Sequence, residues 1–306
     1  MRILVTGGAG FIGSHLSRRL LELGHDVRVL DDLSTGHRSN LDGVAVELIE
    51  GDLTDSDVLT SALRGVEAVH HVAARPSVAR SWADPVATLA VNAQGTAKVM
   101  KAAIAAGARR VVYSSSSSVY GDQPADAKSE DLEPRPISPY GFSKLLGEEI
   151  ALAHARAGDI GVLALRYFNV FGPRQDPDSP YSAVIPIFIK SALAGVTATV
   201  HGDGEQSRDF TFVDNVVHAN VLALESDASG AAVNVACGAA ITLNDLVGAI
   251  SGLDGHPLRI EHGEPRAGDI KHSLADLSRA EQLLGYHPIV DFDTGLRRTY
   301  EAFATA

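Results

Sequence analysis

The chain has 306 residues, of which 45% are hydrophobic and 21% charged, and this is the composition of an ordinary globular protein. The formal net charge of −12 argues against a nucleic-acid or membrane-surface partner, although local arginines can still bind a phosphate-bearing ligand. The sequence has no apolar run of membrane length, and its single Cys237 has no partner for an internal disulfide. We therefore expect a cytoplasmic protein in which Cys237 is a packed thiol.

The first half of the chain predicts alternating strands and helices. Residues 2–6 are typical of a short buried strand, Phe11 to Leu23 has the periodicity of a helix that ends at Gly24, and Val27 to Leu30 is typical of a second strand. Further elements are predicted as strands over Val46 to Ile49, Glu67 to His70 and Arg110 to Tyr113, and as a helix over Pro85 to Ala106. This alternation predicts an α/β fold with a doubly wound parallel sheet of the Rossmann type.

A glycine-rich turn joins the first predicted strand to the first helix. Gly7, Gly10 and Gly13 fit the pattern Gly-x-x-Gly-x-x-Gly, in which the missing side chains let the backbone approach a pyrophosphate at the helix N-terminus. Asp31 ends the second strand, where its carboxylate would hold the adenosine ribose hydroxyls and repel a 2′-phosphate. The expected cofactor is therefore NAD rather than NADP. No metal is expected, because the twelve histidines lack metal-ligand spacing.

Other expected cofactor contacts follow the ends of predicted strands, where ligands bind in such sheets. We expect Asp52 and Leu53 to meet the adenine, and Ala73 and Ala74 to lie on the pyrophosphate side. Together with the glycine loop, the expected cofactor-binding residues are Gly7, Gly10, Phe11, Ile12, Gly13, Asp31, Asp52, Leu53, Ala73, Ala74 and Ser114.

Tyr140 and Lys144 lie four residues apart, downstream of a serine run from Ser114 to Ser118. One helical turn separates the two side chains, so they share a face. The ammonium, together with the positive nicotinamide ring of an oxidised cofactor, would lower the pKa of the phenol from its ordinary value of about 10. Tyr140 could then act as the general base for a sugar or alcohol hydroxyl, with a serine hydroxyl bridging substrate and phenol. The serine run is expected to be ordered rather than a flexible linker, because an apolar strand precedes it and it contains no glycine.

The strict alternation of strands and helices fades from about Gly172. We expect residues 1–171 to form the dinucleotide-binding domain and residues 172–306 to form mainly a smaller, interleaved α/β cap for the substrate, with parts of 212–240 returning to the first domain. Within residues 172–306, helices are predicted over Val184 to Leu193, Val213 to Leu224 and Leu243 to Ile250. Strands are predicted over Ala198 to Val200 and Ala232 to Val235. Trp82 is expected to be a packing residue.

Spaced motifs along the chain resemble those of the extended short-chain dehydrogenase/reductase family, specifically its nucleotide-sugar epimerases, from Met1 to about Pro288. The motifs are TGGAGFIGSHL at 6–16, SSSSSVYG at 114–121, PYGFSK at 139–144, RYFNVFGPRQDP at 166–177, GDGEQSRDF at 202–210 and RAGDIKHSLAD at 266–276. The resemblance implies a tightly held, recycled NAD and a UDP-sugar substrate that is epimerised at C4 through a 4-keto intermediate. It also implies a homodimer formed through the helices at 85–106 and 140–157.

The resemblance also implies roles for individual residues. Ser116 would be the catalytic hydroxyl, Tyr140 the base, and Lys144 its electrostatic partner and a ligand of the nicotinamide ribose. The residues implied to complete the cofactor site are Asn92, Tyr140, Lys144 and Tyr167. The residues implied to bind the UDP-sugar are Ser116, Asn169, Arg208, Arg266, Asp269 and Ser273, with the two arginines on phosphate and Asp269 on the uridine ribose.

Several departures from related branches bear on the reaction. The 4,6-dehydratases carry Asp-Glu where this chain has Ser117-Ser118, and UDP-glucuronate decarboxylases carry Glu at the position of Ser118. Because this chain lacks these acidic side chains, a dehydratase and a decarboxylase function are both disfavoured. The glucuronate epimerases typically carry Thr at the position of Asn169 and Arg at that of Asp176. The small Ser273 resembles epimerases that admit 2-acetamido sugars.

Three alternatives stay open beside a UDP-glucose/galactose 4-epimerase that also accepts N-acetyl forms. The chain could be a UDP-glucuronate 4-epimerase, or another NAD-dependent nucleotide-sugar oxidoreductase that releases its NADH. Outside enzymes, it could be an NAD-sensing regulatory module, which would need the glycine loop but not the tyrosine and lysine.

Overall fold

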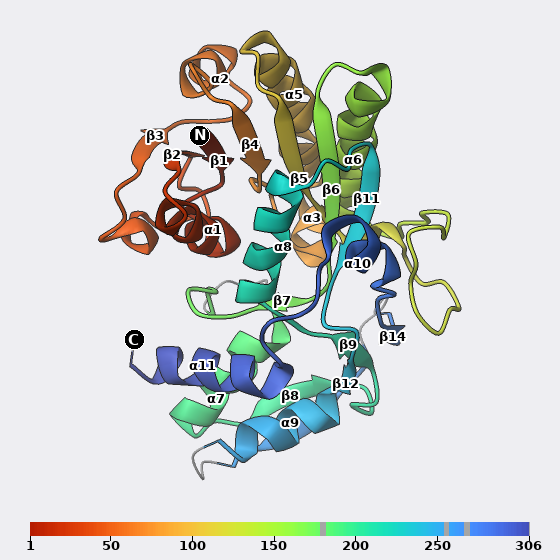
Figure 1. Ribbon diagram of the computed structural model, residues 1–306. Helices are drawn as coiled ribbons and strands as arrows, with labels where there is room; N and C mark the ends of the chain where they lie inside the picture. The colour runs from red at the N-terminus through yellow and green to blue at the C-terminus, as the bar shows by residue number, and fades with distance from the viewer. Residues whose placement is uncertain (178–181, 254–256, 266–269, 306) are drawn as a thin grey trace.

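A seven-stranded parallel sheet organises the computed structural model, which describes residues 1–177, 182–253, 257–265 and 270–305 (Figure 1). The strand order is β11-β6-β5-β4-β1-β2-β3. The strands are β1 Arg2–Thr6, β2 Asp26–Asp31, β3 Glu47–Glu50, β4 Ala68–His71, β5 Arg110–Ser116, β6 Gly161–Tyr167 and β11 Ala231–Val235. The order runs outward in both directions from β1 and β4, so the predicted doubly wound α/β fold is confirmed.

Helices cover both faces of this sheet. One face is covered by α1 Phe11–Glu22, α8 Val213–Glu225 and α10 Ser278–Leu284. The other face is covered by α2 Ser56–Ala62, α5 Thr96–Ala105 and α6 Pro139–Ala157. Side chains in a strand alternate between faces, so Ile3 and Val5 pack on the α1 and α8 face, whereas Leu4 packs on the other. With apolar side chains buried on both faces, the sheet is a rigid platform for groups at its carboxyl edge.

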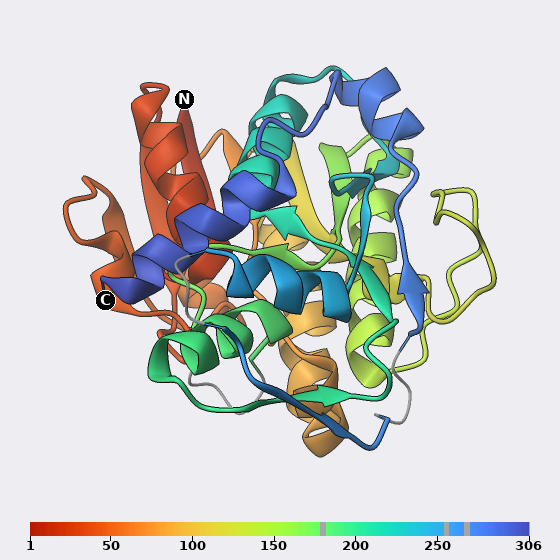
Figure 2. The ribbon, with the colours of Figure 1, turned by 90° about the horizontal axis from the view of Figure 1, so that it is seen from below.

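A smaller part, built mostly from the second half of the chain, lies below the large sheet in Figure 1. It faces the viewer in Figure 2, which shows the molecule from below. Its helices are α7 Val184–Ala194, α9 Leu243–Ser251 and α11 Phe292–Ala304. Its strands are β7 Val170–Phe171, β8 Ala198–His201, β9 Ser207–Asp209, β10 Thr211–Phe212, β12 Ala240–Thr242, β13 Ile260–Gly263 and β14 His272–Ser273. Strand β11 and helix α8 also come from this half, but β11 pairs with β6 and α8 packs on β5 and β6.

Helix α6 has strong start and stop signals, and these fix where Tyr140 falls. Ser138 is the N-cap and accepts a hydrogen bond from Gly141 N at 3.1 Å, while Pro139 occupies the first helical turn. At the other end, Gly158 adopts a left-handed conformation with φ of 80°. Tyr140 therefore lies in the first turn of α6, at the carboxyl edge of the sheet.

Three sequence predictions need correction. The helix predicted over Pro85 to Ala106 is interrupted: α4 covers Pro85–Leu89, a π-helix, η2, covers Ala90–Gly95, and α5 follows. Strand β5 continues beyond Tyr113 into the serine run, which is ordered and leads into the 3₁₀-helix η3, Ser117–Val119. Trp82 is 65% exposed and is not a core residue, because it lies on the outer side of the short helix α3, Val78–Ala83.

The remaining short element is the 3₁₀-helix η1, Arg38–Leu41, after β2. Among the described residues, no helix has the length and apolar character needed to cross a membrane.

Candidate active site

The glycine loop forms a cradle that only glycine can line. At Gly7, where φ is +69°, an added Cβ would lie 2.7 Å from Ala73 Cα, and at Gly13 it would lie 2.1 Å from Gly7 O. Gly10 is the N-cap of α1, and the first turn of that helix carries no acidic side chain. Phe11 and Ile12 begin the helix, so their backbone N–H groups lie at its positive end. This bare, positive backbone surface fits a dinucleotide pyrophosphate.

Asp31 is buried beside this cradle. Its carboxylate accepts hydrogen bonds from Ala9 N and Leu33 N, both at 2.9 Å. Burial raises the pKa of Asp31, and the hydrogen bonds from Leu33 and Ala9 act against that rise. Asp31 therefore holds the glycine loop to the loop after β2, and each carboxylate oxygen keeps a lone pair that these two bonds do not use.

The other expected cofactor residues lie along the same edge of the sheet. Asp52 is exposed just after β3, whereas the Leu53 side chain is buried against Gly95, so Leu53 could offer only its backbone to an adenine. Ala73 follows β4 and touches the glycine loop, with Ala74 next in the chain.

Ser114 and Tyr167 form a buried pair beneath the edge. Their hydroxyls are 2.9 Å apart, and Asn220 Nδ2 donates to Tyr167 Oη at 2.7 Å. Both side chains are therefore engaged inside the protein, and contact with a cofactor would be through the backbone or the edge of the ring.

The structure brings Ser116 and Tyr140 together. Ser116 is the last residue of β5, and its hydroxyl lies near enough to the Tyr140 phenol to act on the phenol's pKa as a hydrogen-bonding group. Ser116 Oγ also lies 3.2 Å from Ser118 Oγ and accepts from Ser118 N at 3.2 Å. Burial raises the pKa of Tyr140, while the hydrogen bond to Ser116 lowers it. The fall in phenol pKa expected from the sequence thus needs further positive charge, which an oxidised nicotinamide would bring.

Lys144 lies one turn after Tyr140 and is buried at 3% exposure. Its Nζ is 4.8 Å from the centre of the Tyr113 ring, a cation–π arrangement. Burial lowers the pKa of Lys144 to about 7, and the Glu148 carboxylate opposes this shift. A lysine with that pKa can change its protonation state near neutral pH when its surroundings change.

Asn92 ties this centre to the loop after β4. Its Oδ1 accepts from Arg75 N at 2.7 Å, and its Nδ2 donates to Arg75 O at 3.2 Å and to Ser143 Oγ at 2.9 Å. Ser143 Oγ in turn donates to Tyr140 O at 2.7 Å. Asn92 is therefore linked to Tyr140 through Ser143 and the α6 backbone, and it lies in the π-helix η2, a form often found at functional sites.

On the substrate side, β9 places Arg208 beside Ser273. The two residues are paired across the β9–β14 ladder, and Ser273 is buried. Arg208 Nη1 donates to Ser207 O at 2.8 Å. Asn169, with φ of +32°, joins the end of β6 to the smaller part and donates from Nδ2 to Asp209 O at 3.4 Å. Arg266 and Asp269, also expected to bind the UDP-sugar, lie outside the described residues.

Some residues that hold the site together are absent from the sequence analysis. Ser81 Oγ accepts from Tyr140 N at 3.0 Å, so α3 braces the start of α6. His71 is buried, with Nδ1 2.8 Å from Thr6 Oγ1 and Nε2 3.0 Å from Thr96 Oγ1. No local sequence pattern marks Ser81 or Thr96 as part of the site.

Comparison with known proteins identifies relatives over the whole chain. The model of the family described as "NAD dependent epimerase/dehydratase family" matches residues 3–236. A UDP-glucose 4-epimerase of Mycolicibacterium smegmatis is 42% identical over 310 residues, covering 99% of this chain and 98% of that protein.

Solved structures agree with this result. A UDP-glucose 4-epimerase of Thermotoga maritima, solved with UDP-glucose, has a TM-score of 0.96 and 36% identity, and the match covers 100% of this chain and 99% of that one. A UDP-N-acetylglucosamine 4-epimerase of Methanobrevibacter ruminantium, in complex with UDP-N-acetylmuramic acid, has a TM-score of 0.95 and 39% identity, with 99% and 98% covered. The resemblance read from the sequence motifs is confirmed, and the chain belongs to the NAD dependent epimerase/dehydratase family.

Proposed function

We propose that this enzyme interconverts UDP-hexoses at C4, with NAD as its cofactor. The observation that carries the proposal is the joined pair of Ser116 and Tyr140 at the sheet edge, with Lys144 buried one turn further along α6. The glycine cradle beside them fits the cofactor, and two similar proteins carry 4-epimerase names.

The chain's own residues would handle the proton at the sugar. Tyr140 takes the proton of the C4 hydroxyl, and Ser116, which can both donate and accept, bridges that hydroxyl and the phenol. Lys144 stabilises the phenolate by its charge. Bound NAD supplies the acceptor and then the donor of the hydride at C4. Because the same residues must serve both faces of the sugar, the hexose must turn while the diphosphate stays held.

We assign the diphosphate grip to Arg208 and Asn169, which lie on the side of the site toward the smaller part. A guanidinium suits diphosphate oxygens, and Arg266 and Asp269 would complete the grip with a second arginine and a ribose contact. The small Ser273 next to Arg208 leaves room for a 2-acetamido group, so we propose that N-acetylated hexoses are accepted as well as glucose and galactose.

Replacement of the base tests this assignment. Tyr140→Phe removes the proton acceptor but keeps the ring, so we expect kcat for UDP-glucose to fall by roughly 10²- to 10⁴-fold. Binding of UDP, measured by calorimetry, should be unchanged because the diphosphate grip is elsewhere. Full activity of the Tyr140→Phe variant would end the proposal, whereas joint loss of activity and UDP binding would point to misfolding.

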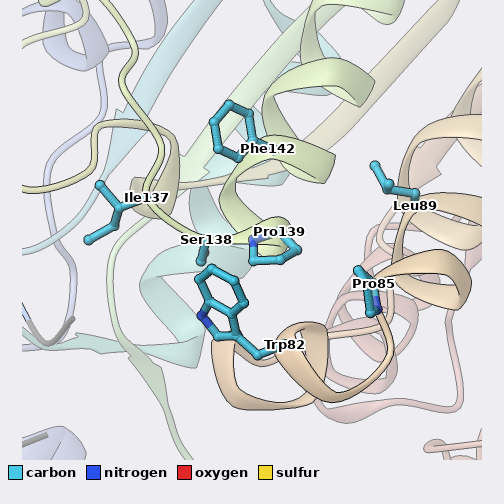
Figure 3. A pocket seen from close by; sticks show the side chains of 7 residues that line it. All are labelled: Trp82, Pro85, Leu89, Ile137, Ser138, Pro139 and Phe142. Atoms are coloured by element: carbon cyan, nitrogen blue, oxygen red, sulfur yellow. The ribbon is translucent and has the colours of Figure 1, made fainter. Parts of the chain in front are cut away.

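We also propose a homodimer, supported by exposed apolar side chains on α3, α4 and α6. Trp82, Leu89 and Phe142 surround a hollow of about 350 Å³ (Figure 3). The apolar residues exposed on this surface are Val78, Trp82, Val86, Leu89, Ile137, Phe142 and Leu146. A contiguous apolar surface of this kind marks a protein contact, and a second copy would bury helices α4 and α6 against their counterparts.

Charge placed on this surface should separate the two copies. Phe142→Glu would bury an unpaired carboxylate in the interface, so we expect the variant to sediment as a monomer where the wild type sediments as a dimer. Val196→Glu is the matched control, because Val196 is exposed at 53%, follows α7 and does not line the hollow, so the variant should leave the dimer intact. A monomeric wild type, or a Phe142→Glu variant that stays dimeric, contradicts the proposed interface.

We propose the cytoplasm as the working compartment. Support comes from the single Cys237, whose pKa burial raises to about 11, so it is a packed thiol with no disulfide role. Recovery of the native protein in a secreted fraction would contradict this assignment.

A further inference from the structure

A carboxylate that takes no part in the reaction described above lies directly behind Lys144. Glu148 is one turn further along α6 and is 0% exposed. Ser115 Oγ donates to its Oε2 at 2.5 Å. Arg166 on β6 donates from Nη2 to Oε1 at 2.5 Å and from Nε to both carboxylate oxygens at 3.2 and 3.1 Å. The carboxylate is therefore gripped by the two strands under α6, one of which ends in Ser116.

Stability alone is a weak reason for such a pair. Removing two charges from water costs several kcal/mol per ion, and apolar side chains of similar volume often stabilise a core as well or better. The Arg166 guanidinium also lies 4.8 Å from the centre of the Tyr120 ring, so the pair is enclosed on both sides. A pair that is costly to bury and adjacent to the reacting centre calls for a role at that centre.

The titratable groups around Lys144, including the ion-pair partner of Glu148, come from four elements. His71 on β4 is neutral, because burial lowers its pKa to about 3. Tyr113 on β5 is neutral, because burial raises its pKa. Tyr140 lies on α6 itself, and Arg166 on β6 is positive. Within the described part of the chain, Glu148 is the negative charge that acts on the Lys144 ammonium.

We propose that Glu148, gripped by Arg166 and Ser115, is a positioning residue that holds Lys144 as an ammonium under Tyr140. This inference rests on the proposed function, because it concerns the same proton transfer. The grip fixes the α6 turn that carries Lys144 against β5, whose last residue is Ser116. The carboxylate compensates a positive charge that would otherwise be buried beside an aromatic ring and a neutral histidine.

Two variants of the same ion pair separate this role from a purely structural one. Glu148→Gln removes the negative charge and leaves Arg166 uncompensated, and both changes disfavour the ammonium. The alkaline limb of the kcat–pH profile, which reports loss of the Lys144 proton, should move down by about one pH unit. Arg166→Gln leaves Glu148 with one positive neighbour, so the limb should move up. A structural brace predicts loss of kcat in both variants with no opposed shift.

Matched variants guard against misfolding. Arg166→Lys keeps the charge but loses the forked geometry, so kcat should fall while the limb stays within a few tenths of a pH unit of the wild type. The double variant with Gln at both positions removes both members of the buried ion pair together, so it should fold even if a single variant does not. The alkaline limb of the double variant should also lie at lower pH than that of the wild type. Glu148 lies on the same helix as Lys144, so the loss of its charge outweighs the loss of the Arg166 charge.

The measurement is the kcat–pH profile with UDP-glucose, alongside bound NAD content for each variant. Limbs that move in opposite directions in Glu148→Gln and Arg166→Gln support the inference. Limbs that coincide with the wild type, or that move together, overturn it, and so does an unmoved limb in the double variant. A wild type that turns over no UDP-hexose instead refutes the proposed function, so the two failures are distinguishable.

Discussion

At the scale of single residues, Tyr140 combines two opposing influences. Burial raises the pKa of its phenol, and the hydrogen bond to Ser116 lowers it. The phenol therefore keeps its proton until a bound cofactor adds positive charge that favours the phenolate. Tyr140 can act as a base only once the site is assembled in this way. Lys144, whose pKa burial lowers to about 7, shares this dependence on its surroundings.

Loss of the Ser116 hydroxyl should show how much the bridge contributes. Ser116→Ala removes the partner that lowers the pKa of Tyr140, so we expect kcat for UDP-glucose to fall by roughly 10²-fold, with bound NAD retained. The control is Ser61→Ala on the exposed side of α2, which should leave kcat unchanged. Unaltered turnover in Ser116→Ala would show that Tyr140 receives the proton without a bridge.

Sequence patterns identify residues whose chemistry is local. Gly7 and Gly13 are marked by spacing alone, and the structure shows the close approach that requires them. Glu148 is held by Ser115, 33 residues before it, and by Arg166, 18 residues after it, and the three residues lie on three different elements. No sequence periodicity reveals such a contact. The exposure of Trp82 was also unreadable, because an apolar residue at a contact surface resembles one in a core.

At the scale of elements, helix α6 packs unusually closely on η2 and β5. A Cβ added at Gly147 would lie 2.4 Å from Tyr113 Oη and 2.8 Å from Asn92 O. Tyr113 Oη donates to Lys144 O at 3.2 Å, and Thr96 Oγ1 donates to Asn92 O at 2.6 Å. The approach of these elements therefore sets both the Lys144 turn and the π-helix. The sequence predicted one long helix here because a π-helix has the same composition as an α-helix.

A methyl group at Gly147 should push α6 away from η2. We expect Gly147→Ala to lower the free energy of unfolding by about 2 kcal/mol and to reduce kcat, because Lys144 moves with the helix. Gly248→Ala is the matched control, since Gly248 lies within α9 with nothing within 4 Å of an added Cβ. That control should gain roughly 0.5 to 1 kcal/mol in chemical denaturation. Equal stability changes in the two variants would contradict the close packing.

At the scale of the whole molecule, the two halves of the chain share one sheet. Strand β11 pairs with β6, and α8 covers β5 and β6. Asp209 on β9 accepts from Cys237 N and Gly238 N at 2.9 and 3.0 Å, so the loop after β11 is tied to the substrate side. Alternating apolar segments predicted the large sheet. The strands of the smaller part are only two to four residues long, and apart from β8, which was predicted, they carry too little pattern to be recognised.

A fragment of residues 1–171 should therefore fail to fold cooperatively. Without α8 and β11, the apolar face of β5 and β6 and one edge of the sheet are exposed. We expect the fragment to show no sharp thermal transition by circular dichroism and to lose NAD. The full chain should show a sharp transition and retain NAD. A fragment with a cooperative transition and bound NAD would show that the first 171 residues are an independent domain.

The central claim is that the site moves hydride out of and back into one sugar carbon. The direct measurement is product analysis with UDP-glucose, UDP-N-acetylglucosamine and UDP-glucuronate, while absorbance of reduced nicotinamide is followed in the solution. We predict the C4 epimer of UDP-glucose, and of the N-acetylated sugar, with no net release of NADH. Accumulation of free NADH with an oxidised sugar, or the absence of any C4 epimer, would contradict the account.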